Sequence, residues 1–154
     1  MKKRKITYSA MHVLMASPDK PTPIEKRTYQ LTRMWQGVRA LELDPYPKVA
    51  DWAVVSDAIN MMETFLVHGL IQDPDDLITK AMGALADVGS CHKGGKPLRL
   101  SGDNVQIIRF LLADYADVIE EMPERTLIAC HRRTEKRIHD ILDGKTQPHD
   151  MRLP

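Results

Sequence analysis

Cysteine is scarce in this sequence, and long apolar runs are missing. The two cysteines, Cys91 and Cys130, are too few for a disulfide framework and are typical of a protein from a reducing compartment. No segment approaches the roughly eighteen consecutive apolar residues of a membrane-spanning helix. We therefore expect neither a small disulfide-stapled secreted domain nor a protein that crosses a membrane by helices.

A cleavable leader is also not favoured, although the first residues have some of its features. Lys2 to Lys5 precede an apolar stretch over 10–16, which is the order found in a signal peptide. That stretch contains His12, lies at the lower length limit and has no clear small-residue cleavage site. We therefore expect a cytoplasmic protein with no membrane partner.

Size and composition are those of one folded domain. With 154 residues the chain can bury about two thirds of the surface that its unfolded form exposes. Apolar residues make up 43% and charged residues 28%, so most of the chain should fold rather than stay disordered. Folding then requires neither a metal nor a disulfide.

The charges are distributed unevenly, although the formal net charge is only +1. Residues 1–40 carry nine Lys and Arg against two Asp and Glu, a net of +7. Residues 41–121 carry six against fourteen, a net of −8, and residues 122–154 carry seven against five, a net of +2. A basic leader on an acidic body can reach a polyanion, or it can dock on the acidic face of a second copy of the chain.

Helical spacing of apolar residues dominates the chain, and no segment has the alternation of a strand. The pattern predicts five helices, over about 23–43, 49–68, 73–88, 102–122 and 124–143. The start signals are a capping box at Thr22 with Pro23 in the first helical position, Asp73 for the third helix and Ser101 for the fourth; the stop signals are Gly69, Gly89 and Gly144.

Five helices with short connections predict an all-α, single-domain bundle. Residues 17–23, SPDKPTP, contain three prolines and predict a linker. The expected organisation is a flexible basic N-terminal arm with its linker over 1–21, the helical bundle domain over 22–144 and a polar C-terminal tail over 145–154.

The last helix contains the densest group of reactive side chains. Residues 129–142, ACHRRTEKRIHDIL, hold a thiol, two imidazoles and four cations. At 100° per residue, Cys130 and His131 fall on or beside the apolar face, whereas Glu135 falls among the polar residues. The cations gather on the opposite face, with Arg137 at its side: Arg125, Arg132, Arg133 and Lys136.

A cationic helix face and a cationic arm can both contact phosphates, which makes nucleic acid one candidate partner. The predicted nucleic-acid contacts are Lys2, Lys3, Arg4, Lys5, Arg132, Arg133, Lys136 and Arg137. A face that only meets water is the alternative, because the body is acidic and no turn of the helix-turn-helix type precedes the last helix.

Phe110 predicts a partner interface of another kind. It falls on the polar side of its helix, among Asp114, Asp117 and Glu121. An aromatic side chain in this position indicates a surface for a host protein or for a second copy of the chain, which would make the protein a homo-oligomer. The alternative is that the tail or residues 6–16 cover Phe110.

Metal binding and catalysis have weaker signals. His131, Glu135 and His139 recur every four residues, and Cys91-His92 is similar to Cys130-His131. Adjacent residues on a helix point about 100° apart, and eight residues advance roughly 12 Å, so neither pattern is a specific signature. We predict no metal ligand, no cofactor and no catalytic residue. A zinc-binding protein or a small metal-dependent enzyme stays as an alternative.

The segment NVQIIRFLLADYADVIEEMPERTLIACHRRTEKRIHDIL, residues 104–142, resembles the C-terminal part of small uncharacterised proteins of bacterial phages and prophages. The match covers about a quarter of the chain and contains no catalytic motif. The resemblance implies a phage or prophage setting and supplies no mechanism, and it favours an accessory protein that acts on phage or host nucleic acid or on a host factor. We expect a non-enzymatic interaction protein, with a purely structural self-associating protein as the alternative.

Overall fold

The computed structural model describes residues 7–100 and 102–144, and within them the chain is all-helical. These described residues form six helices instead of the five expected, because a short additional helix forms in the N-terminal arm. They are α1 (Ala10–Met15), α2 (Ile24–Leu43), α3 (Val49–Val67), α4 (Leu77–Lys93), α5 (Asp103–Glu121) and α6 (Glu124–Leu142). The prediction of an all-α helical bundle is thus confirmed. Ser101 lies outside the described residues, as do Lys2 to Lys5 and the tail.

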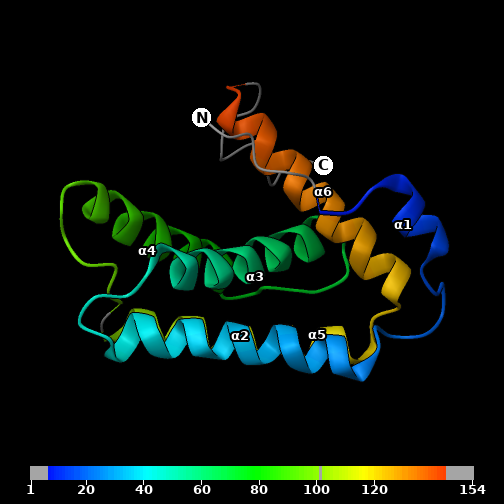
Figure 1. The fold of residues 1–154 in the computed structure, drawn as a ribbon, viewed down its shortest axis with the longest axis horizontal. Coiled ribbons are helices and arrows are strands. Elements are labelled where there is room, and N and C mark those ends of the chain that lie inside the picture. The colour runs from blue at the N-terminus through cyan, green and yellow to red at the C-terminus, as the bar shows by residue number, and fades with distance from the viewer. Residues whose placement is uncertain (1–6, 101, 145–154) are drawn as a thin grey trace.

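Helix α3 is the centre of the bundle (Figure 1). It contacts α2, α4, α5 and α6, and α2 lies alongside α5 on one side of it. Its apolar residues cover more than half of its circumference, which only a helix with neighbours on several sides can bury. Val55, Ile59 and Phe65 are fully buried, and the Phe65 ring stacks on Tyr115 of α5 with their centroids 6.1 Å apart.

Gly37 allows α2 to approach α3 closely. A Cβ at this position would lie 2.6 Å from Cγ1 of Val54 and 2.9 Å from the backbone oxygen of Asp51. Both distances are shorter than van der Waals contact, so a larger residue would force the two helices apart. The bare backbone of Gly37 therefore sets the spacing between α2 and the central helix.

The packing of Gly89 against Trp52 explains why one predicted helix end was wrong. We expected Gly89 to end the third predicted helix, but α4 continues to Lys93. A Cβ on Gly89 would lie 3.2 Å from Cζ2 of Trp52, and the indole nitrogen of Trp52 donates to the backbone oxygen of Leu85 at 3.0 Å. Gly89 thus accommodates the indole ring and does not end the helix.

Two of the other predicted helix boundaries are confirmed, and one predicted start signal was wrong. The Asp73 carboxylate accepts hydrogen bonds from the backbone N–H groups of Leu77 and Ile78, both at 2.9 Å, as expected for the start of α4. Gly69, at φ +69°, follows the end of α3 as predicted. The capping box at Thr22 was wrong: α2 has no side-chain cap, and the buried Thr22 hydroxyl has no hydrogen-bond partner among the described residues.

The proline-rich stretch at 17–21 packs on the corner between α5 and α6. Pro21 forms an isolated bridge with Pro123, and the backbone N–H of Glu124 donates to the backbone oxygen of Lys20 at 2.8 Å. The backbone N–H of Arg125 donates to the oxygen of Ser17 at 2.9 Å. These bonds fix the start of α6 against the beginning of the chain. No helix in the described ranges is long and apolar enough to cross a membrane.

Candidate functional site

Helix α6 carries most of the side chains that the sequence singled out, and its C-terminal half extends beyond the layer of α3 and α4 (Figure 1). Cys130, on the inner side, is 1% exposed, and Thr134 is also buried. Arg132, Arg133 and Lys136 are exposed. The helix therefore has the two faces that its period predicts, and we call these three exposed residues the cationic face.

The positive charges of α6 act on His68 at the end of α3. Burial lowers the pKa of His68 below its ordinary value of 6.5, and the positive charges of Arg133 and Arg137 lower it further. A histidine next to cations is harder to protonate because a second positive charge is repelled. The lowered pKa of His68 thus reflects in part the positive charges on this part of α6.

Arg137 does not lie with the cationic face. It is half-buried, and its Nη2 donates to the Thr64 hydroxyl of α3 at 3.0 Å. Burial lowers the pKa of Arg137, whereas the negative charge of Glu63 opposes that effect. Of the predicted nucleic-acid contacts, Arg137 therefore also helps to hold α6 on the body. Lys2, Lys3, Arg4 and Lys5 lie outside the described residues.

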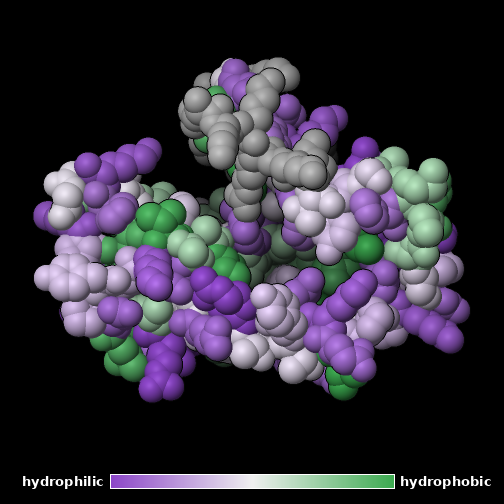
Figure 2. Space-filling view, in the orientation of Figure 1, coloured by the Kyte–Doolittle hydropathy of each residue, from purple (hydrophilic) through white to green (hydrophobic). Residues whose placement is uncertain are grey.

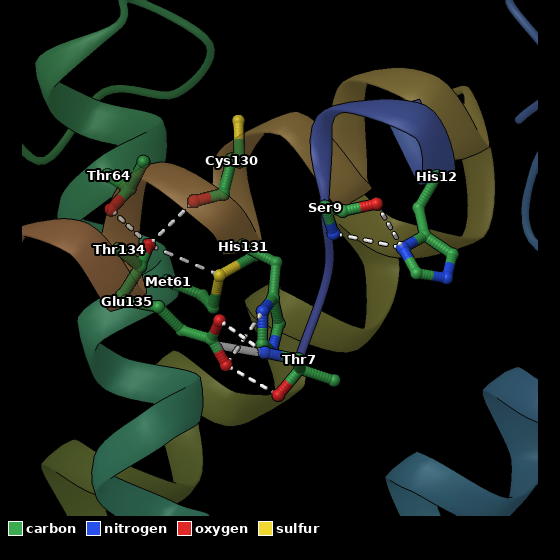
Figure 3. Close-up of polar contacts among 9 residues, drawn as sticks. All are labelled: Thr7, Ser9, His12, Met61, Thr64, Cys130, His131, Thr134 and Glu135. Atoms are coloured by element: carbon green, nitrogen blue, oxygen red, sulfur yellow. Dashed lines mark hydrogen bonds and ion pairs between the residues drawn. The ribbon is translucent and has the colours of Figure 1, made fainter. Parts of the chain in front are cut away.

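A buried polar seam joins α6 to α3 (Figure 3). The hydroxyls of Thr64 and Thr134 are 2.5 Å apart, and the Thr134 hydroxyl lies 2.8 Å from the backbone oxygen of Cys130 and 3.3 Å from Sδ of Met61. The Thr64 hydroxyl lies 3.2 Å from the backbone oxygen of Asn60. Each hydroxyl has one proton to donate but can accept as well, so the two threonines satisfy each other inside the core.

Glu135 lies in a different place from the one that the helical period predicted. It is 7% exposed rather than among the outer charges. Its carboxylate accepts the backbone N–H of Thr7 at 2.8 Å and the Thr7 hydroxyl at 2.6 Å (Figure 3). His131 Nδ1 lies 3.6 Å from the same carboxylate. A buried carboxylate needs such partners, and the N-terminal segment supplies two of them.

Residues 7–16 form a strap across α6. The Tyr8 ring meets His131 edge-on, with centroids 5.0 Å apart, and Arg125 donates to the backbone oxygens of Leu14 at 2.9 Å and Ala16 at 3.2 Å. Both ends of the strap are therefore attached to α6. No local sequence pattern predicts this arrangement, because a polar residue on a helix does not reveal which distant segment it binds.

The middle of the strap leaves apolar side chains uncovered. Helix α1 has no buried residue, and Met11, Leu14 and Met15 are 62%, 67% and 79% exposed. Phe110 on α5 is 62% exposed as well, so residues 7–16 do not cover it. The two patches belong to different elements and give the molecule separate apolar surfaces.

The described residues contain no group of three or more His, Cys, Asp or Glu side chains that could hold a metal ion. Cys91 is exposed near the end of α4, whereas Cys130 is buried on α6. Burial raises the pKa of the Cys130 thiol, and Arg133 opposes that effect. The Cys130 thiol therefore stays protonated near neutral pH and packs as a small hydrophobic group.

No family model, no curated protein and no solved structure matches this chain. The assignment of a function therefore depends on the side chains described above.

Proposed function

We propose that this protein is a non-enzymatic, phage-type accessory protein that binds nucleic acid through the cationic face of α6. The proposal is supported mainly by one observation: Arg132, Arg133 and Lys136 are exposed together on a helix whose C-terminal half extends beyond the layer of α3 and α4. The resemblance of residues 104–142 to small phage proteins favours the same class of partner.

The spacing of the cationic face suits a phosphate backbone. Residues 132 and 136 are one helical turn apart, so their side chains are neighbours on the surface, and Arg133 flanks them. Guanidinium groups can donate two hydrogen bonds to one phosphate, and the ammonium adds a point charge. The basic residues Lys2 to Lys5 supply four further cations at the other end of the chain. Contacts of this kind give affinity without reading a base sequence.

The acidic body restricts where a polyanion can lie. Residues 41–121 have a net charge of −8, and they form α3, α4 and α5. Like charges repel, so a nucleic acid that approaches the molecule is directed to α6. The expected complex is electrostatic, and its affinity falls steeply with added salt.

A gel-shift titration against duplex and single-stranded DNA at two salt concentrations tests the proposal. Removing three phosphate contacts with R132A, R133A and K136A together should weaken binding and reduce the slope of log affinity against log salt by about two to three units. The matched control removes three exposed lysines elsewhere, with K80A, K93A and K96A together. Equal losses in both triple variants, or binding that salt does not affect, would contradict a specific role for the cationic face.

Self-association is a second candidate function, favoured by the exposed ring of Phe110. An uncovered aromatic side chain among carboxylates is a feature of partner surfaces. In this alternative the basic arm meets the acidic body of a second copy, and nucleic acid plays no part.

A further inference from the structure

A pocket with a volume of about 260 Å³ opens between the strap, α2, α3, α5 and α6. The molecule is hollowed between α2 and α6, and hydrophobic residues lie in this hollow (Figure 2). Three phenol rings line the pocket from three elements: Tyr8 of the strap, Tyr29 of α2 and Tyr115 of α5. Met34 and Leu127 are among its apolar lining residues, so the site is mixed in character, as ligand sites are.

A buried hydroxyl lies at the wall of the pocket. Thr22 lines the pocket and is 6% exposed, and its Oγ1 makes no hydrogen bond among the described residues. Leaving such a group unpaired in the native state is unfavourable, and natural sites of this kind call for an explanation. The hydroxyl oxygen has almost no accessible surface, so a bound molecule could pair with it only after the wall of the pocket rearranges.

The charges around the pocket favour a cation over an anion. Lys26 and Arg33 balance Asp57 and Glu124 among the lining residues. Arg33, however, is already bound to the Asp51 carboxylate at 3.1 Å. Two further carboxylates lie next to lining residues, Asp51 at Arg33 and Glu135 at His131. One further cation, Arg27, donates to the backbone oxygen of Thr22 at 2.9 Å, so these groups leave an excess of one negative charge when the histidine is not counted.

Burial and nearby carboxylates raise the pKa values of two tyrosines of the pocket, Tyr8 and Tyr115. Burial raises the pKa of Tyr8, and the charges of Glu124 and Glu135 raise it further. Burial raises the pKa of Tyr115 to about 12, with further contributions from Tyr8 and from the charge of Asp57. Both phenols therefore stay neutral near pH 7, and the face of a neutral phenol ring can attract a cation.

We propose that this pocket binds a small organic cation of the alkylammonium class, with Tyr8, Tyr29 and Tyr115 as its aromatic walls and Asp57 and Glu124 as its counter-charges. Aromatic enclosure with nearby carboxylates is how proteins recognise quaternary ammonium groups. The site is distinct from the cationic face, so it stands whether or not the protein binds nucleic acid.

The test titrates the isotope-labelled full-length chain with choline and follows its backbone amide resonances by nuclear magnetic resonance. The control ligand is dimethylbutanol, which has the shape of choline without its charge, and benzoate serves as a single-ring anion. We expect choline to shift resonances of residues around the pocket and to bind at least about fivefold more tightly than dimethylbutanol, because only the cation gains from the ring faces.

Two substitutions at Tyr8 separate the ring from its hydroxyl. Tyr8→Phe keeps the ring and should leave choline affinity within about twofold, whereas Tyr8→Leu should weaken it on the order of tenfold. Tyr29→Leu is a second test at a residue that is 75% exposed, where folding depends little on the ring. Equal binding of dimethylbutanol, stronger binding of benzoate, or no shift with choline would each overturn the proposal.

Discussion

The carboxylate of Glu135 on α6 accepts two hydrogen bonds from Thr7, a residue 128 positions earlier in the chain. This pair attaches the first described residue to the last helix. It also explains why a charged residue can occupy a buried position: the backbone N–H and the hydroxyl of Thr7 replace two of the water molecules that the carboxylate loses.

Glu135→Ala should release the strap. We expect a loss of about 2 kcal/mol in the free energy of unfolding, because hydrogen bonds to a charged group are removed and Thr7 loses its acceptor. Thr7→Ala, which removes the hydroxyl but keeps the backbone N–H, should cost only about 1 kcal/mol. Urea denaturation followed by circular dichroism measures both values. The contact has no energetic role if neither variant differs from the wild type.

The buried pair of Thr64 and Thr134 should be coupled energetically. Thr134→Val leaves the Thr64 hydroxyl with fewer partners inside the core, so it should destabilise the protein by about 1 kcal/mol or more. The double variant Thr64→Val with Thr134→Val should cost less than the sum of the single variants, with an interaction energy of about 0.5 to 1.5 kcal/mol. A complete double-mutant cycle in urea checks this. Strict additivity would contradict the arrangement of the seam.

Two glycines, one on α2 and one on α4, should respond in opposite ways to alanine. Gly83 lies on α4 with nothing within 4 Å of a Cβ built on it, so Gly83→Ala should stabilise the protein by about 0.5 to 1 kcal/mol. At Gly37 the new Cβ would lie 2.6 Å from Val54, so Gly37→Ala should destabilise it by about 1 to 3 kcal/mol. Thermal unfolding of the two variants gives the comparison. A stabilising Gly37→Ala would show that α2 and α3 are not as close as described.

His68 should titrate below its ordinary pKa of 6.5. Because the folded state then binds the proton less readily than the unfolded state, its contribution to stability is present above the unfolded pKa and is lost as the pH falls through the folded pKa. Arg133→Ala should raise the pKa of His68, since it removes a nearby positive charge. A proton resonance titration of the imidazole measures the shift, and Lys80→Ala on α4 serves as the distant control. A pKa that stays the same in Arg133→Ala would contradict the electrostatic link.

Local patterns predicted a large part of this fold, and long-range contacts account for the rest. The helical spacing around Val55, Ile59 and Phe65 indicated a central helix, and the Asp73 start signal is reproduced in the hydrogen bonds of α4. The pattern missed α1, which is six residues long and has no buried face to create a period. It also misplaced the end of α4. A glycine after a helical stretch predicts a helix end from the local sequence, but Gly89 lies within α4 and packs against Trp52.

The candidate sites were likewise predictable where they depend on one helix, and not where they depend on distant segments. The exposure of Arg132, Arg133 and Lys136 follows from helical geometry alone. The burial of Glu135 does not, since it depends on Thr7 at the other end of the chain. The tyrosine-lined pocket could not be predicted either, because its rings come from segments whose arrangement depends on how the whole bundle packs.

Phe110→Glu tests the self-associating alternative. If the exposed ring lies in an interface between copies, a charge at this position should be buried on association and should shift the oligomer toward the monomer by at least about tenfold in dissociation constant. Tyr46, which is 81% exposed in the connection between α2 and α3, provides the matched control in Tyr46→Glu. Size-exclusion chromatography with light scattering over a range of concentrations measures the molar mass of each. A wild-type chain that is monomeric at every concentration would rule out this role for Phe110, and equal dissociation of the two variants would show that the effect comes from net charge and not from the ring.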